Sequence, residues 1–174
     1  MTTPLAVAPI ALLLGDRRMN RDTEARKVAQ LRDSAIGEMD RDNVDQAMAL
    51  LEEAFSACEN HGLVDTTIFA TVLSAAGRHA VLAGEPDTAA QLYDRAVGIF
   101  VREGAQPIII AQAAAGRAAA QEALGYLREA EEDYIAALDL LAKSDHPSAL
   151  EWTNQVRGLL AALRDRMSSK DSNK

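Results

Sequence analysis

Residues 77–96 read GRHAVLAGEPDTAAQLYDRA, and the spacing of small and aromatic residues within this stretch decides the fold. The pattern consists of Gly77, Gly84, Ala89, Tyr93 and Ala96. It occurs again 42 residues earlier and 41 residues later in the chain. The earlier copy consists of Ala35, Asp42, Ala47, Leu51 and Ala54, and the later copy of Ala118, Gly125, Ala130, Tyr134 and Ala137. Three copies at a nearly constant spacing predict a protein built from stacked repeats.

Each position of this pattern has a physical role in a pair of packed helices. The first small residue lets the first helix of a pair approach the second, and the two alanines lie where helices touch. The larger residue between those alanines fills the space between neighbouring pairs. The turn position needs a residue that tolerates left-handed backbone geometry, as glycine and aspartate do. We therefore expect turns between helices at Asp42, Gly84 and Gly125.

Apolar periodicity, with proline and glycine as punctuation, predicts seven helices and no strand. The expected helices span about 22–40, 44–60, 65–83, 86–103, 107–124, 127–143 and 147–167. The first six form repeats of about 22–61, 65–104 and 107–143, and the seventh has the single apolar stripe of a helix that caps the last repeat. The predicted domain covers residues 22–167, between an apolar tail at 1–21 and a polar tail at 168–174.

The chain resembles the tetratricopeptide repeat (TPR) family over roughly residues 28–143. The resemblance rests on the small-Gly-Ala-aromatic-Ala pattern, and its best copy is the one that contains Gly77 and Tyr93. It implies an all-α fold, a right-handed α-solenoid of three TPR helix pairs plus a C-terminal capping helix. The usual TPR has 34 residues. The longer repeats of 41–42 residues are similar to those of kinesin light chains.

Composition excludes several classes of function. The chain has 174 residues and a formal net charge of −8. A nucleic-acid-binding protein needs a basic face for phosphates, so we expect no nucleic acid partner. The apolar run at residues 4–15 is too short to span a bilayer, and no basic residue precedes it as in a signal peptide. We therefore expect a cytoplasmic protein without a membrane span.

The residues that could carry catalysis are not spaced for it. His61, His79 and His146 lack the spacing of zinc ligands, and Cys58 is the only cysteine. We expect Cys58 to be a buried thiol within a helix. The acidic residues between 129 and 133 form a solvated face, and no glycine-rich phosphate loop is present. We therefore expect no enzyme activity, no cofactor and no metal.

In TPR proteins the first helices of the pairs line a groove, so the resemblance implies binding of a partner's peptide or helix there. The residues that it places in the groove are Arg32, Ile36 and Met39 in the first helix, Thr71, Ser74, Arg78 and Val81 in the third, and Gln112, Ala115, Ala119 and Glu122 in the fifth. Chaperone-binding TPRs hold a C-terminal carboxylate with several Lys and Asn side chains. Among the corresponding positions of this chain, only the one occupied by Arg32 is basic.

These observations predict an adaptor or scaffold that holds another protein or peptide. Two alternatives stay open. One is a self-assembling structural subunit, a homo-oligomer that stacks through the uncapped surface of its first repeat and its apolar N-terminus. The other is a secretion chaperone of the TPR type. Residues 5–14 are in addition a candidate occupant of the groove, either in cis or from another copy.

Overall fold

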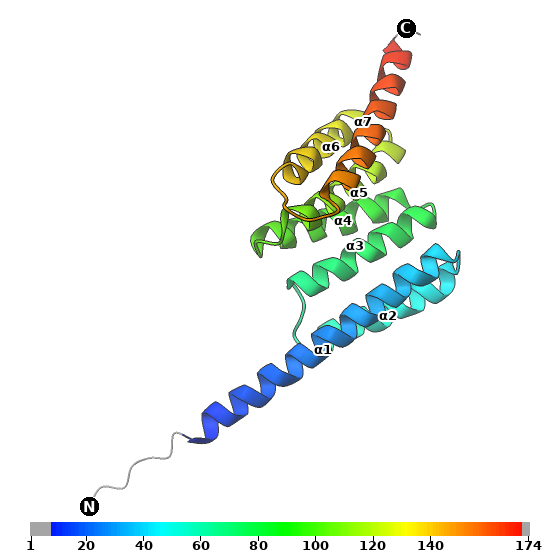
Figure 1. Ribbon diagram of the computed structural model, residues 1–174. Coiled ribbons are helices and arrows are strands. Elements are labelled where there is room, and N and C mark those ends of the chain that lie inside the picture. Colours follow the sequence, from blue (N-terminus) through cyan, green and yellow to red (C-terminus); the bar gives the residue numbers. More distant parts are fainter. Residues whose placement is uncertain (1–7, 172–174) are drawn as a thin grey trace, which may run out of the picture.

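The computed structural model describes the backbone of residues 8–171 and the side chains of residues 19–169. Within this range the chain forms α1 (Ala8–Asp40), α2 (Val44–Asn60), α3 (Thr67–Leu82), α4 (Pro86–Arg102), α5 (Pro107–Ala123), α6 (Leu127–Leu141) and α7 (Ala149–Asp171). The described residues contain no strand. The first six helices stack as pairs, and α7 packs against α6 and α5 (Figure 1). The prediction of an all-α repeat solenoid is confirmed.

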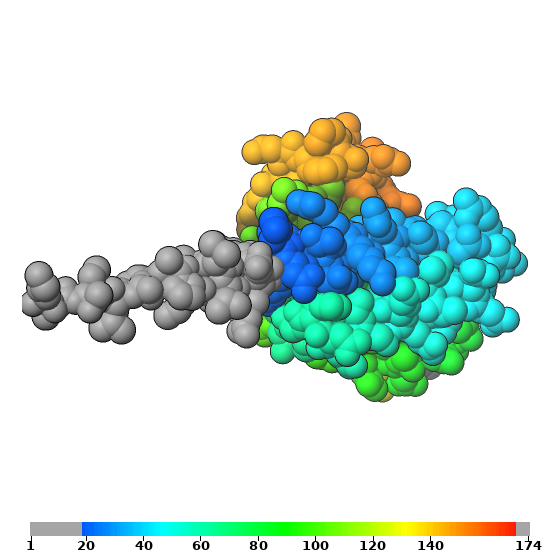
Figure 2. Space-filling model, turned by 90° about the horizontal axis from the view of Figure 1, so that it is seen from below, coloured from blue at the N-terminus to red at the C-terminus, as the bar shows by residue number. Residues whose placement is uncertain are grey.

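Successive pairs do not lie directly above one another. Seen from the end of the stack that carries α1 and α2, the helices α6 and α7 project beyond one side of the first pair (Figure 2). The stack is therefore offset sideways rather than straight. An offset of this kind is expected when helical repeats follow one another with a small rotation each time.

The predicted turns adopt left-handed backbone geometry. The φ angles are 65° at Asp42, 75° at Gly84 and 85° at Gly125. The amide that follows each of these residues donates to a carbonyl in the last turn of the preceding helix, as the Glu85 amide does to the carbonyl of Ala80 at 2.8 Å. These bonds satisfy carbonyl groups that the helix end leaves unpaired.

The repeated small residues form the helix contacts that their spacing predicts. Ala35 and Ala118 have no exposed surface, and Gly77 at the equivalent position of the middle repeat is also buried. The same holds for the two alanine positions of every repeat, since no surface is exposed at Ala47, Ala54, Ala89, Ala96, Ala130 and Ala137. Because these side chains are so short, the backbones of paired helices approach closely over the whole stack.

Asp42 should be replaceable by glycine with a gain in stability. A left-handed conformation is unfavourable for a residue with a side chain and costs glycine nothing. We expect Asp42→Gly to raise the free energy of unfolding by about 0.5–1 kcal/mol, measured by urea or thermal unfolding. The same change at Asp139, inside α6, should instead lower it by about 0.5 kcal/mol. Equal effects at the two positions would contradict this account of the turn.

The two ends of the chain differ from the prediction. α1 begins at Ala8 rather than near Asp22, so most of the predicted N-terminal tail is helix. Pro9 falls in the first turn, where no hydrogen bond from its backbone nitrogen is needed, and a single glycine, Gly15, costs a helix only about 1 kcal/mol. α7 continues to Asp171 rather than ending near Met167. Residues 1–7 and 172–174 lie outside the described part of the chain.

Candidate functional site

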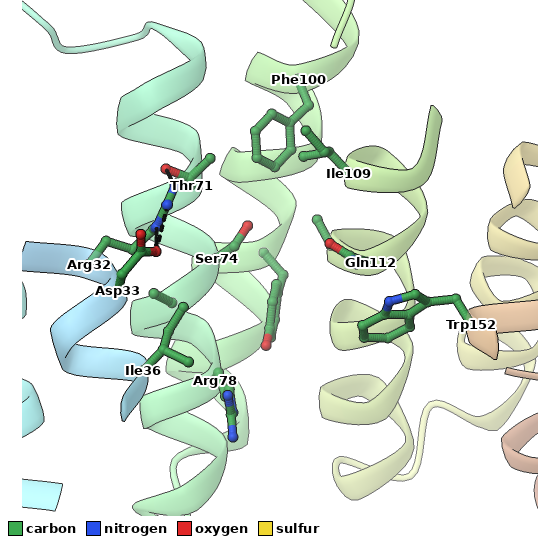
Figure 3. A pocket seen from close by; sticks show the side chains of 13 residues that line it. Arg32, Asp33, Ile36, Thr71, Ser74, Arg78, Phe100, Ile109, Gln112 and Trp152 are labelled. Carbon is green, nitrogen blue, oxygen red and sulfur yellow. Dashed lines mark hydrogen bonds and ion pairs between the residues drawn. The ribbon is translucent and has the colours of Figure 1, made fainter. Parts of the chain in front are cut away.

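A cleft of about 430 Å³ opens between the first helices of the pairs (Figure 3). Its lining comes from five helices. The lining residues are Arg32, Asp33 and Ile36 of α1, Thr71, Ser74, Ala75 and Arg78 of α3, Tyr93 and Phe100 of α4, Ile109, Gln112 and Ala113 of α5, and Trp152 of α7. We refer to this site as the cleft. Its volume lies in the range of ligand-binding pockets.

Helical periodicity places the cleft residues on one stripe of each helix. Thr71, Ser74 and Arg78 follow one another at three- and four-residue steps along α3, so their side chains share a face. Ile109 and Gln112 repeat this arrangement on α5 at a three-residue step. The faces of α3 and α5 meet at the cleft, and residues far apart in sequence therefore line one site.

The floor of the cleft is aromatic and aliphatic. Tyr93 and Phe100 reach it from α4 and are buried, whereas Ile36, Ile109 and Trp152 are half-buried. Figure 3 shows Trp152 extending from α7 toward α5, across the cleft from Ile36 and Arg78. Half-buried apolar side chains around a concave space are the usual lining of a binding pocket.

Two arginines supply positive charge at one side of the cleft. Arg32 donates to the Thr71 hydroxyl at 2.8 Å and to Asp33 Oδ1 at 2.6 Å. Arg78 donates to Asp40 Oδ1 at 2.5 Å. The side chains of Asp33 and Asp40 are 65% and 59% exposed, so these ion pairs are weak and can exchange for the charge of a ligand.

One polar group, the Ser74 hydroxyl, lies between the apolar side chains of the cleft floor. The Ser74 hydroxyl is buried and has no hydrogen-bond partner among the described residues. Gln112 faces it across the gap between α3 and α5 (Figure 3). A buried hydroxyl without a partner costs about 1–3 kcal/mol, so this position favours a ligand that brings a hydrogen-bonding group.

Tyr93 is held between two glycines that belong to different repeats. A β-carbon added at Gly77 of α3 would lie 2.9 Å from its ring, and one added at Gly116 of α5 would lie 2.4 Å from it. Burial raises the pKa of the Tyr93 hydroxyl to about 12, although the charge of Arg78 acts in the opposite direction. Tyr93 is therefore a neutral, tightly packed part of the cleft floor at physiological pH.

Six of the eleven predicted groove residues line the cleft: Arg32, Ile36, Thr71, Ser74, Arg78 and Gln112. Two others were placed on the wrong face, because Met39 and Ala115 are only 5% and 6% exposed and belong to the core. Val81 is exposed but lies outside the cleft. Whether any of these residues binds a ligand stays a prediction.

The remaining two predicted residues, Ala119 and Glu122, are partly covered and lie outside the cleft. Glu122 accepts a hydrogen bond from the Tyr134 hydroxyl at 3.2 Å and forms an ion pair with Arg166 of α7. α7 therefore occupies the end of the face that α1, α3 and α5 share. It shortens the groove that the TPR resemblance implied.

Sequence reasoning missed the cleft residues that come from other helices. Phe100 belongs to a second helix of a pair, and the family pattern places only first helices at the groove. Trp152 lies on the apolar stripe of the capping helix, so the sequence predicted that it packs against the last repeat. As the only tryptophan in the chain it was nevertheless the clearest available signal, because tryptophan is enriched at binding surfaces.

The described side chains include no metal-binding cluster, and the single cysteine is buried. No group of three or more His, Cys, Asp or Glu side chains among them could hold a metal ion. Cys58 is fully buried, as predicted, and burial raises the pKa of its thiol to about 11, so it stays protonated at neutral pH. None of the described helices combines the length and apolar character that crossing a bilayer requires.

Paired helices, left-handed turns and a cleft between first helices define a helical-repeat solenoid. Solved structures place this solenoid in the TPR class. The first TPR of Spaghetti (RPAP3), solved with the HSP90 peptide SRMEEVD, is 18% identical, with 79% of this chain and 95% of that chain covered and a TM-score of 0.55. The first TPR domain of human RPAP3, solved by NMR, is 16% identical, with 81% and 98% covered and a TM-score of 0.56.

The chain therefore has a TPR-type fold. No protein-family model and no curated protein matches the sequence. At this level of identity the structural likeness establishes the fold and not the ligand.

Proposed function

We propose that this chain is a protein-interaction module that binds a peptide or helix of a partner protein in the cleft. The observation that carries the proposal is the cleft itself, with its half-buried apolar lining, two arginines and an unpaired hydroxyl at Ser74. Apolar side chains of a ligand would cover Ile36, Ile109 and Trp152, while its polar groups would pair with the remaining donors and acceptors. Such a module would act as an adaptor or scaffold.

A structural neighbour supports this class of function. The first TPR of Spaghetti (RPAP3) was solved with a bound HSP90 peptide, so a TPR unit of similar extent does bind a peptide. The peptide itself is not the ligand that we propose here. Its three carboxylate side chains and C-terminus require several basic groups, and this cleft contains only Arg32 and Arg78.

Peptide display provides a direct test, with Trp152 as the reporter. Peptides selected from a random library on the wild-type protein should change the fluorescence of this single tryptophan. Gln112→Phe should weaken their binding at least tenfold, about 1.4 kcal/mol, because the larger ring fills the cleft. SRMEEVD should bind more weakly than the selected peptides.

Gln91→Phe is the matched control, since Gln91 is exposed on α4 and lies outside the cleft. It makes the same chemical change and should leave binding unaltered. Circular dichroism must show the same helix content for both variants. Selected peptides that bind both variants equally well would place the binding surface elsewhere and contradict the proposal.

A further inference from the structure

The N-terminal part of α1 extends beyond its partner helix. α1 has 33 residues and α2 has 17. Arg21 already lies at the end of α2, because its guanidinium donates to the backbone oxygen of Gly62, in the loop that follows α2, at 2.7 Å. Residues 8–18, which we call the extension, continue α1 away from the stack (Figure 1).

The sequence of the extension is strongly apolar. Residues 8–14 read APIALLL and contain no charged residue, and Asp16, Arg17 and Arg18 follow. Helices in proteins gain most of their stability from packing an apolar face against something else. A helical segment of this composition that continues beyond the end of α2 therefore points to a binding surface that covers it.

The extension cannot reach the cleft of its own molecule. Arg32, Asp33 and Ile36 line the cleft from the same helix, α1. A helix rises 1.5 Å per residue, so Leu14 lies roughly 27 Å along the axis from Arg32. Only a second molecule can bring an extension to this cleft.

We propose that the extension of one copy lies in the cleft of a second copy, so that two copies associate. This inference rests on the proposed function, because it names the ligand of the same cleft. The uncharged run matches the apolar floor formed by Phe100, Ile109 and Trp152. An amphipathic or apolar helix laid in a groove is a recurrent mode of recognition.

Charge supports a second copy as the occupant. Residues 8–18 contain one aspartate and two arginines, a formal charge of +1. The whole chain carries −8, so the remainder carries −9. The basic residues of one extension therefore approach an acidic body, with Asp33 and Asp40 close to the arginines of the cleft. Mutual exchange of extensions closes a two-fold dimer, whereas one-way insertion would build a chain of molecules.

Sedimentation equilibrium of the full chain tests the proposal. The wild type should show a concentration-dependent dimer. Leu12→Asp combined with Leu13→Asp alters the extension, and Gln112→Phe fills the cleft. Each change should raise the dissociation constant at least tenfold, while Gln91→Phe should leave it unchanged.

A mixing experiment distinguishes the cleft from a nonspecific apolar contact. The Leu12→Asp, Leu13→Asp variant keeps an intact cleft, and the Gln112→Phe variant keeps an intact extension. Although each is monomeric alone, a mixture of the two should form a 1:1 dimer with one occupied cleft. A synthetic peptide of residues 4–18 should also change Trp152 fluorescence in the first variant, which gives a second readout if Gln112→Phe folds poorly.

Three outcomes would overturn the proposal. The wild type could stay monomeric at every concentration, or the dimer could survive Gln112→Phe with its fold intact. Alternatively, the chain could bind phosphatidylcholine vesicles through the extension and form no dimer, which would make a membrane the occupant. In each case, selected peptides that still bind the cleft would leave the proposed function standing.

Discussion

Replacing Gly116 with alanine is expected to lower the free energy of unfolding by about 2–3 kcal/mol. The new β-carbon would lie 2.4 Å from Cζ and 2.5 Å from Cε1 of Tyr93, closer than nonbonded carbon atoms approach. For a chain of this length such a loss corresponds to a fall in Tm of roughly 4–12 °C, measurable by thermal unfolding.

Tyr93 cannot avoid this contact by a simple movement. On its other side, a β-carbon built on Gly77 would already be 2.9 Å from Cε2 of the same ring, so the ring has little free space there. A shift of α5 away from α4 would open the contacts between the second and third repeats. The loss of stability in Gly116→Ala therefore comes from poorer packing between the second and third repeats. The shape of the cleft floor should change as well, because Tyr93 is part of it.

Gly98 provides the matched control. It lies inside α4, is exposed, and has open space around an added β-carbon. Gly98→Ala should therefore stabilise the protein by about 0.5–1 kcal/mol through helix propensity alone. Combining Gly116→Ala with Tyr93→Leu should remove most of the penalty of the first change, as a double-mutant cycle measures. A Gly116→Ala protein as stable as the wild type would exclude the proposed packing of Tyr93.

The role of Gly116 also shows where sequence reasoning ends for this protein. Gly77 belongs to the repeated pattern, so the spacing of residues alone predicts that it lies where two helices touch. Gly116 stands in an alanine-rich helix at a position that the pattern does not mark. Its importance comes from Tyr93 of the preceding pair. The pattern predicts that Tyr93 fills the space between pairs, but it does not identify the residue of the next pair that the ring meets.

Turns and helix pairs were predictable because each has a local physical cause. A left-handed residue at Asp42, Gly84 or Gly125 leaves a recognisable residue type in the sequence. The orientation of groove residues was harder to predict. Met39 and Ala115 were assigned by the pattern of the family, and a small rotation of a helix about its axis is enough to move a residue from groove to core. The contribution of α7 to the cleft depends on the angle at which α7 packs against α5 and α6, and this angle is not encoded in a local sequence pattern.

The second large effect is expected at Arg117, which joins three helices. Its Nε and Nη2 donate to the two carboxylate oxygens of Asp133 on α6, each at 2.7 Å, and its Nη1 donates to Asp94 on α4 at 2.6 Å. The side chains of Arg117 and Asp133 are 22% and 13% exposed, so this ion pair is mostly shielded from water. A two-pronged pair of this kind is among the stronger polar contacts in proteins.

Arg117→Met should lower the free energy of unfolding by about 2–3 kcal/mol, measured by urea unfolding. Most of this loss comes from leaving the Asp133 carboxylate shielded from water without its partner. Arg41→Met removes a comparable but exposed ion pair with Glu38 and should cost no more than about 0.5 kcal/mol.

The combined change Arg117→Met, Asp133→Leu distinguishes a shielded charge from lost packing. If the uncompensated carboxylate causes the loss, this double variant should recover most of the stability, because two apolar side chains replace the pair. A double variant as unstable as Arg117→Met would assign the effect to the shape of the arginine instead.

The pH dependence of this contribution follows from the sign of the shift at Arg117. Its hydrogen bond with Asp133 is the main cause that raises the Arg117 pKa above its ordinary value. A raised pKa in the folded state means that the stability from the charged arginine is present below the unfolded pKa and is lost only as the pH rises through the folded one. The difference between wild type and Arg117→Met should therefore stay constant from pH 7 to about pH 10. A difference that disappeared within this range would show that the arginine charge is not what holds α4, α5 and α6 together.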